Sequence, residues 1–268
     1  MKRILSFVLI IMSIGSAAAQ SYSDVFDQAF ARDDVPAQRN ALELWQREAP
    51  NDVNLFIARY NFFANLAMGQ QASLTETGAS QAGAATHWAD SALAALDEGI
   101  ALYPDRLDLY FGKIYFLGEI ARWDAFEREI IRMLDSSRAR DHRWTFPNVT
   151  DGIESLISEA VMDYQTTMMA TLPSVPDGLN PLAADSAMTR RVRNVARRTI
   201  QLFPSDANAL YLLGMSYVDV DNEKALKYLL RADELVSDNT HVLSLLAAVC
   251  DRLGRKGQAA SYRERMRN

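Results

Sequence analysis

Side chains that could bind a metal ion or act in catalysis are few in this sequence and far apart. The three histidines, His87, His142 and His241, have neither a second His nor a Cys at metal-ligand spacing. The patterns of a nucleophile elbow and of a phosphate-binding loop are absent. The sequence therefore predicts no metal, no cofactor and no catalytic residue, and we interpret the protein as a non-enzyme.

The closest approach to a cation site is the acidic run Asp219-x-Asp221-x-Glu223. An EF-hand loop needs Gly at its sixth place and Glu at its twelfth. Here those places hold Lys224 and Leu230. We therefore interpret the run as a turn followed by a helix cap.

One irregular stretch, Asp141–Pro147, carries polar and aromatic side chains together. His142, Arg143 and Trp144 could form a polar site, which would suit an enzyme or a glycan-handling accessory protein of the cell envelope. In the simpler interpretation, Trp144 and Phe146 fill a gap between helices, because aromatics in long loops usually supply core area. We favour the simpler interpretation.

A second charged feature is a predicted helix that carries five arginines, namely Arg190, Arg191, Arg193, Arg197 and Arg198. Such a helix could bind an anionic partner, for example a glycan, a lipid head group or an acidic protein. It could equally be a solvated face, with Val192 and Val195 turned inward, and we favour this second view. Interleaved aromatics that could stack on bases are missing, which supports the second view, and we do not expect an exported acidic protein to bind nucleic acid.

The elements that would position these side chains are clearest between Pro204 and Ser237. Apolar residues recur there at three- and four-residue spacings, which places them on one face of each of two helices. Gly214 lies inside the first helix, where Gly costs about 1 kcal/mol relative to Ala, so close approach of the second helix is expected. The turn between the helices is Asp219–Asn222.

This pattern resembles the tetratricopeptide (TPR) repeat, a helix–turn–helix of 34 residues. The residues that match are Leu210, Leu213, Gly214, Tyr217, Ala225, Leu229 and Ala232. The turn is one residue shorter than usual, and Ser237 stands where the family has Pro. A second copy follows 33 residues later, at Leu243, Leu246, Ala247, Cys250 and Ala259. The resemblance implies a TPR protein, which we expect to be bacterial and exported.

A short sequence motif that contains Pro recurs along the chain and divides it into hairpins. It occurs at Ala49–Phe56, Tyr103–Tyr110 and Phe203–Leu210, and in each copy Pro ends one helix while an Asn or Asp four residues later is expected to cap the next. The result is an all-α fold, an α-α superhelix (TPR-like solenoid) of about six helical hairpins.

Four hairpins are expected before the two C-terminal repeats. Their helices span 23–32 and 36–48, 53–66 and 84–102, 107–121 and 124–134, and 150–170 and 186–203, with Thr150 as a cap. The Gly-, Ala- and Ser-rich segment 68–83 is expected to be a mobile loop, and 135–149 and 172–184 are also expected to be loops. The predicted domains are degenerate hairpins over 20–135, an irregular hairpin over 136–203 and two repeats over 204–268.

The first nineteen residues have the form of a secretory signal peptide. Lys2-Arg3 is the basic region, residues 4–14 are apolar, and Ala17-Ala18-Ala19 is the small-residue cleavage site. No second apolar run is long enough to span a membrane. We expect a periplasmic or secreted protein whose single Cys250 is a small buried side chain rather than a nucleophile.

Charge is distributed unevenly along the mature sequence. Residues 20–185 carry 12 basic and 25 acidic side chains, a net charge of −13, whereas residues 186–268 carry 14 and 9, a net charge of +5. Such asymmetry can mark an interaction surface. One hypothesis is therefore a self-assembling structural protein, in which the acidic part of one copy meets the basic end of another.

The TPR resemblance also implies a concave groove, lined by the first helix of each repeat, that holds a peptide. The positions it indicates are Asn54, Ile57, Asn61, Asp108, Phe111, Tyr115, Asn208, Tyr211 and Met215, and all but Ile57 are our predicted partner-binding residues. Amides suit a peptide backbone and rings suit its side chains. Helix capping would by itself explain Asn54, Asp108 and Asn208. The leading hypothesis is a non-enzymatic scaffold or adaptor of the cell envelope that binds a protein or peptide.

Overall fold

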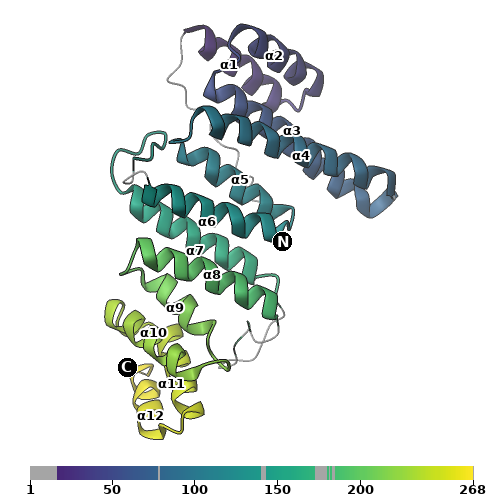
Figure 1. Ribbon diagram of the computed structural model, residues 1–268. Helices are drawn as coiled ribbons and strands as arrows, with labels where there is room; N and C mark the ends of the chain where they lie inside the picture. Colours follow the sequence, from purple (N-terminus) through teal and green to yellow (C-terminus); the bar gives the residue numbers. More distant parts are fainter. Residues whose placement is uncertain are drawn as a thin grey trace. The chain divides into compact units, whose positions relative to one another are not determined.

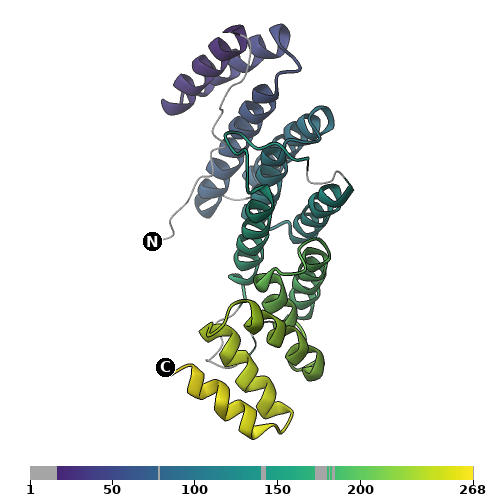
Figure 2. The same cartoon turned by 90° about the vertical axis from the view of Figure 1, so that its left-hand side faces the viewer.

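The computed structural model describes residues 17–77, 79–139, 143–172, 180, 182 and 185–267. Within these residues the chain forms twelve α-helices and no sheet, with only two isolated backbone bridges, Arg106 to Thr145 and Phe146 to Val149 (Figures 1 and 2). The predicted all-α class is confirmed. None of the described helices combines the length and the hydrophobicity that a bilayer crossing requires.

The described chain divides into two compact units. Unit 1 holds the described residues up to Ile120 together with Arg143–Asp151, and unit 2 holds Ala121–Ala139 and the described residues from Gly152 onward. The helices of unit 1 are α1 (Ala17–Ala31), α2 (Val35–Glu48), α3 (Val53–Thr77), α4 (Ala79–Leu102) and α5 (Leu107–Glu119). Those of unit 2 are α6 (Trp123–Ala139), α7 (Ile153–Met169), α8 (Ser186–Leu202), α9 (Ala207–Met215), α10 (Asn222–Leu235), α11 (Thr240–Arg252) and α12 (Lys256–Arg265).

The core of unit 1 is aromatic. Trp45 of α2 is fully buried against Phe26 of α1 and against Leu55 and Phe62 of α3. Its indole Nε1–H donates to Asp52 Oδ2 at 3.1 Å, so burial leaves no polar atom of the ring without a partner. Trp45 thus lies on the inner face of α2 together with Ala41 and Leu42, as the three- and four-residue spacing of these apolar residues predicts.

The predicted loop over 68–83 is wrong, because α3 continues to Thr77 and α4 begins at Ala79. The two helices pack side by side as a long hairpin (Figures 1 and 2). The segment contains Ala, Gln, Leu and Met as well as Gly and Ser, and the former are good helix formers. The α3–α4 pairing then supplies the tertiary contact on which helices in proteins mostly depend.

In unit 2, α9 and α10 form the hairpin that the sequence marks most clearly. A Cβ built on Gly214 would lie 2.7 Å from Leu229 Cγ and 3.3 Å from the carbonyl oxygen of Ala225. The expected close approach of the second helix at Gly214 is therefore confirmed. Cys250 of α11 is fully buried and burial raises the pKa of its thiol, as a packing role requires.

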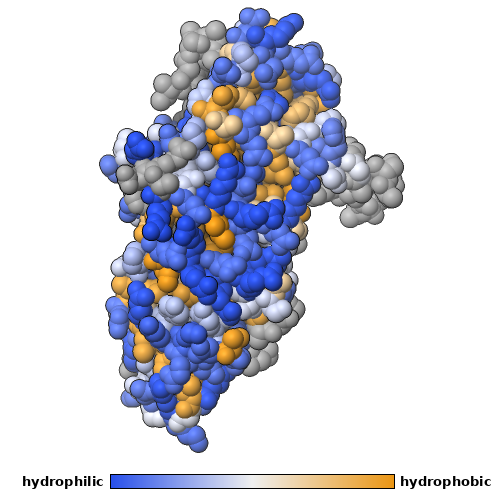
Figure 3. All heavy atoms as spheres, in the orientation of Figure 1, coloured by the Kyte–Doolittle hydropathy of each residue, from blue (hydrophilic) through white to orange (hydrophobic). Residues whose placement is uncertain are grey.

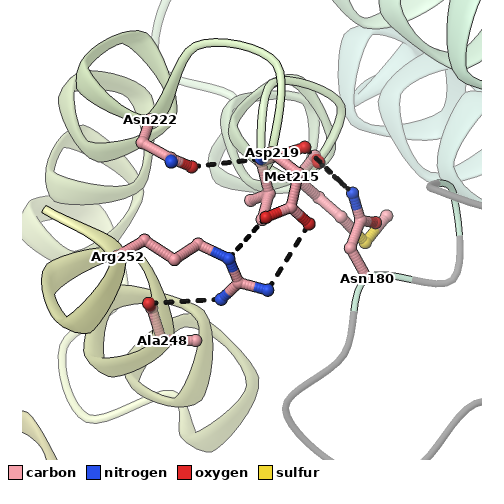
Figure 4. Close-up of polar contacts among 7 residues, drawn as sticks. Asn180, Met215, Asp219, Asn222, Ala248 and Arg252 are labelled. Atoms are coloured by element: carbon pink, nitrogen blue, oxygen red, sulfur yellow. Dashed lines mark hydrogen bonds and ion pairs between the residues drawn. The ribbon is translucent and has the colours of Figure 1, made fainter.

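The acidic run between α9 and α10 is a turn and a cap, as predicted. Asp221 accepts the backbone N–H of Lys224 at the start of α10, and Asp219 adopts a left-handed backbone with φ of 68°. The Asp219 carboxylate receives the guanidinium of Arg252 from α11, and its N–H donates to the side chain of Asn222 (Figure 4). The run therefore joins two repeats, and no group of acidic or histidine side chains suited to a metal ion occurs in the described part of the chain.

The recurring Pro motif predicts the helix boundaries correctly, but the cap that we predicted from it is at the wrong residue. Asp52 accepts the N–H of Asn54 at 3.0 Å, and Asp206 accepts the N–H of Ala209 at 2.8 Å. The capping position is thus two residues after Pro, not four. Helix α7 likewise begins after Gly152, whose φ is 78°, and no side-chain cap is made there, so Thr150 is not its cap.

Candidate functional site

In unit 1, four of the five predicted partner-binding residues are buried. Asn54 and Asn61 lie on α3 with 2% and 7% of their surface exposed, and Ile57 between them is also buried. On α5, Asp108 is buried beneath Arg106, whose guanidinium donates to both carboxylate oxygens at 2.7 and 2.8 Å. Phe111 packs against Phe146 with ring centroids 5.8 Å apart.

The side chain that this set leaves accessible in unit 1 is Tyr115, which is half-buried. In unit 2, Asn208 is exposed, and Tyr211 is half-buried, with burial raising the pKa of its phenol. Met215 is buried, and its carbonyl accepts a hydrogen bond from Asn180 Nδ2 at 3.2 Å (Figure 4). A partner could therefore reach Tyr115, Asn208 and Tyr211 without rearrangement.

The aromatic stretch after α6 closes the core of unit 1. Trp144 is 4% exposed and meets Tyr110 edge-on, with centroids 4.9 Å apart. Thr145 holds the stretch in place, because its N–H donates to Asp105 O at 2.8 Å and its carbonyl accepts the N–H of Leu107 at 3.0 Å. Asp141 and His142 lie outside the described residues. Of the alternative polar site near Asp141–Trp144, the structure describes Arg143, which is exposed, and Trp144, which serves packing.

The arginine helix α8 is joined to α6 by a row of polar contacts within unit 2. Arg191 donates to Asp124 at 2.6 Å, Asn194 donates to Glu127 at 2.8 Å, and Arg198 pairs with Asp135 one helical turn further on. Sequence analysis missed this row, although the residues recur at helical spacings of three and four on α8. The acidic partners lie some 65 positions earlier, and only tertiary packing brings them close.

Two further arginines of α8 make contacts with residues that follow α9. Arg193 lies over the ring of Tyr217 at 4.5 Å and donates to the carbonyl of Ser216, while Arg197 donates to the Tyr217 hydroxyl at 2.8 Å. Arg190 is exposed. Four of the five arginines thus make contacts within unit 2, and Val192 and Val195 are buried, as the favoured view predicts.

The contact between Arg191 and Asp124 predicts a measurable titration. The hydrogen bond from Arg191 lowers the pKa of the Asp124 carboxyl below its ordinary value. A carboxyl whose pKa is lower in the folded state contributes stability above its unfolded pKa, and this contribution is lost as the pH falls through the folded value. We expect Arg191→Gln to raise the pKa of Asp124 toward the ordinary value, as followed by NMR of the side-chain carboxyl carbon.

Asp221 is the internal control for this titration. Its pKa is lowered by a different cation, Lys224, within α10. It should keep its lowered pKa in the Arg191→Gln variant. An unchanged pKa at Asp124 would contradict the assignment of Arg191 as the cause.

A hollow with room for a ligand lies between α2 and α3, and we call it the α2–α3 groove. It is an open groove of about 530 Å³. Its lining residues are Arg39, Leu42, Glu43, Gln46, Arg47, Arg59, Phe62 and Phe63. Those on α2 recur every three or four residues, as one helix face requires.

The floor of the α2–α3 groove is apolar and its rim is charged. Leu42 and Phe62 are buried and belong to the core cluster, and Phe63 stacks on Trp88 of α4 with centroids 5.8 Å apart. Figure 3 shows hydrophobic residues reaching the surface over the α3–α4 part of unit 1. The described rim residues Arg39, Glu43, Gln46 and Arg47 are exposed. An apolar floor with a few polar groups above it is the usual composition of a ligand site.

Two of the groove arginines have intramolecular contacts that orient them. The Arg39 guanidinium carbon lies 5.9 Å from the centroid of Phe62, and Arg59 forms a bidentate pair with Glu98 of α4. Arg47 is in the last turn of α2. Sequence analysis missed the groove, although the spacing Arg39, Glu43, Arg47 was available as a signal, because the facing residues of α3 are assigned only by packing.

Comparison with known proteins finds similarity in structure alone. No family model matches the chain, and no curated protein matches it. Among solved structures, YrrB, "a TPR protein with an unusual peptide-binding site", shares 13% identity and a TM-score of 0.45 over 84% of this chain and 90% of its own. PilW, a "type IV pilus biogenesis factor", shares 12% identity and a TM-score of 0.40 over 92% and 91%.

A third similar structure is residues 41-end of MamA from Desulfovibrio magneticus RS-1. It shares 14% identity and a TM-score of 0.41, over 76% of this chain and 93% of its own. The all-α class of this chain rests on its own helices, and its likeness to these structures is distant.

Proposed function

We propose that this protein is a non-enzymatic interaction scaffold, and that the α2–α3 groove of unit 1 binds an extended segment of a partner protein. The observation that carries this proposal is an open groove of about 530 Å³ with a buried apolar floor and an exposed charged rim. A peptide fits such a groove, because its side chains can reach the floor while its backbone meets polar side chains at the rim. Gln46 offers both a donor and an acceptor for that backbone.

The compartment and the further contact surface are parts of the same proposal. The basic, apolar and small-residue pattern of residues 1–19 supports export to the bacterial envelope, to the periplasm or beyond. Tyr115, Asn208 and Tyr211, the accessible members of the predicted concave-face set, are candidates for additional contacts with the partner. Self-association through opposite charges is less well supported, because many arginines of unit 2 are paired within it.

Site-specific photo-crosslinking tests the proposal. A photoreactive residue is placed at Gln46 in the groove, at Tyr211 in unit 2 and, as a control, at Asn40, which is exposed on α2 but does not line the groove. After exposure to envelope extract, we expect one peptide segment to crosslink at position 46 and none at position 40. The segment is then synthesised and its affinity for the purified protein measured.

A blocking variant completes this experiment. Gln46→Trp should fill the groove and weaken binding of the synthetic segment by about tenfold or more, whereas Asn40→Trp should leave it within about twofold. Crosslinks at Tyr211 alone would reject the groove but keep a scaffold role for unit 2. The same crosslinking at positions 40 and 46 would reject a specific site on α2.

A further inference from the structure

We infer that the α2–α3 groove recognises an acidic segment, with two carboxylates about four residues apart on either side of a bulky apolar side chain. This inference rests on the proposed peptide-binding function and names the chemistry of the partner. It starts from a charge distribution. Between residues 20 and 104 the chain has 11 acidic and only four basic side chains, which are Arg32, Arg39, Arg47 and Arg59.

Three of those four arginines line one groove. Acidic side chains outnumber basic ones almost threefold in this region, and yet three of its four basic side chains lie in this groove. Glu43 is the only acidic residue among the groove's described lining residues, so the lining has a net charge of +2. An acidic ligand is therefore attracted to this groove, whereas the excess of acidic side chains elsewhere in residues 20–104 repels it.

The spacing of the arginines along α2 sets the spacing of the carboxylates. Arg39 and Arg47 are eight residues apart, which is about 12 Å along a helix axis. An extended peptide advances about 3.3 Å per residue, so two of its residues four positions apart span a similar length. Arginine binds carboxylates in a bidentate geometry and is exposed at both positions, so each can pair with one acidic side chain.

The interior of the groove supplies the apolar element of the motif. Leu42, Phe62 and Phe63 line the same groove as the two arginines, and the Trp88 ring stacks on Phe63. A large apolar side chain midway between the two carboxylates would lie over them. Glu43, also midway along α2, would repel a third carboxylate there, so a run of acidic residues is a poorer ligand than a spaced pair.

Arg59 has a different role from the two arginines of α2. It faces them from α3 and is held by both carboxylate oxygens of Glu98, with one contact of 3.2 Å. Its charge is therefore partly neutralised and its position is constrained. We assign it to the wall of the groove, and the two exposed arginines of α2 to direct contact with the ligand.

Fluorescence anisotropy with synthetic peptides tests this inference on the purified protein. The probe is a labelled nine-residue peptide with capped ends, with Phe at its centre and Asp two positions to either side. The comparison peptides carry Asn in place of both Asp, or Ala in place of Phe. We expect each comparison peptide to bind about tenfold more weakly than the probe.

Variants of the protein identify the contacts. Arg39→Gln and Arg47→Gln should each weaken binding of the probe about fivefold, and neither should affect the Asn peptide. Arg32→Gln is the matched control, because Arg32 is the one basic residue of this region outside the groove. It removes the same charge and should change the affinity by less than about twofold.

The outcomes separate this inference from the function on which it rests. Equal binding of the Asp and Asn peptides, blocked by Gln46→Trp, would overturn acidic selectivity and leave the peptide groove standing. Equal binding of the Phe and Ala peptides, or an Arg32→Gln effect as large as that of Arg39→Gln, would reduce the interaction to general charge attraction and overturn the motif. Absence of binding by every peptide, together with no crosslink at position 46, would overturn the proposed function as well.

Discussion

Replacing Gly214 with valine is expected to destabilise unit 2 by about 3 kcal/mol. The first added carbon would lie 2.7 Å from Leu229 Cγ and 2.9 Å from Leu229 Cδ2, closer than side-chain carbons approach one another. Leu229 is fully buried, and the backbone carbonyl oxygen of Ala225 would lie 3.3 Å from the same added carbon. Helices α9 and α10 must therefore separate, and the loss should appear in urea denaturation followed by circular dichroism.

Gly257 provides the matched control for this substitution. It lies in α12, where nothing within 4 Å would meet an added carbon, and it is exposed. Gly257→Val should change the free energy of unfolding by no more than about 0.5 kcal/mol, since Val and Gly differ little in helix propensity. Faster amide exchange in α9 and α10 of the Gly214 variant would locate the damage, and equal effects of the two substitutions would contradict the close-approach argument.

Replacing Trp45 with alanine is expected to destabilise unit 1 by about 4 kcal/mol. The side chain is fully buried, packs in one cluster with Phe26 of α1 and with Leu55 and Phe62 of α3, and donates a hydrogen bond to Asp52. The substitution leaves a large cavity and removes the donor partner of a carboxylate that also caps α3. Urea denaturation followed by circular dichroism measures the loss without relying on the missing fluorophore.

The neighbouring residue Leu44 is the control for Trp45. It lies on the same helix with 39% of its surface exposed. Leu44→Ala should change stability by no more than about 0.5 kcal/mol. A loss of more than about 2 kcal/mol at Leu44, or of less than about 1 kcal/mol at Trp45, would show that the inner face of α2 has been assigned wrongly.

The substitution of Trp45 also bears on the proposed function, because the α2–α3 groove shares Leu42 and Phe62 with the core around Trp45. A core variant should therefore lose peptide binding as a consequence of unfolding. The exposed arginine variants should lose binding while keeping their stability. Measuring both quantities for every variant keeps a folding defect from being read as a binding contact.

Local chemistry was predictable where a few neighbouring residues decide the outcome. The positions of Trp45, Gly214 and Cys250 on inner helix faces follow from three- and four-residue spacing alone. The turn at Asp219–Asn222 follows from the capping and left-handed tendencies of Asp and Asn. The cap predicted from the recurring Pro motif was wrong by two residues. Asp and Asn occur at more than one position of the motif, and residue type alone does not decide which of them caps the helix.

Segment 68–83 shows where composition misleads. Its Gly, Ser and Thr suggested a loop, but isolated glycines within a helix cost only about 1 kcal/mol each. Packing of α3 against α4 can offset that cost, since tertiary contact is the main support of most helices. The sequence of the segment does not determine whether α3 and α4 lie close enough to pack.

The sequence by itself determined the helical character of this chain, its hairpin punctuation and the inward faces of its helices, because these depend on neighbours within one or two turns. Tertiary structure alone decided what the charged residues do. It brought Asp124, Glu127 and Asp135 against α8, and so gave polar side chains of that helix partners within unit 2 that lie more than 60 positions away in the sequence. It also placed Arg39 and Arg47 across from Phe62 and Phe63, and so formed the groove on which the proposed function rests. The physical reason is that a charge acts on whatever lies within a few ångströms of it, and only the packing of distant segments determines what that is.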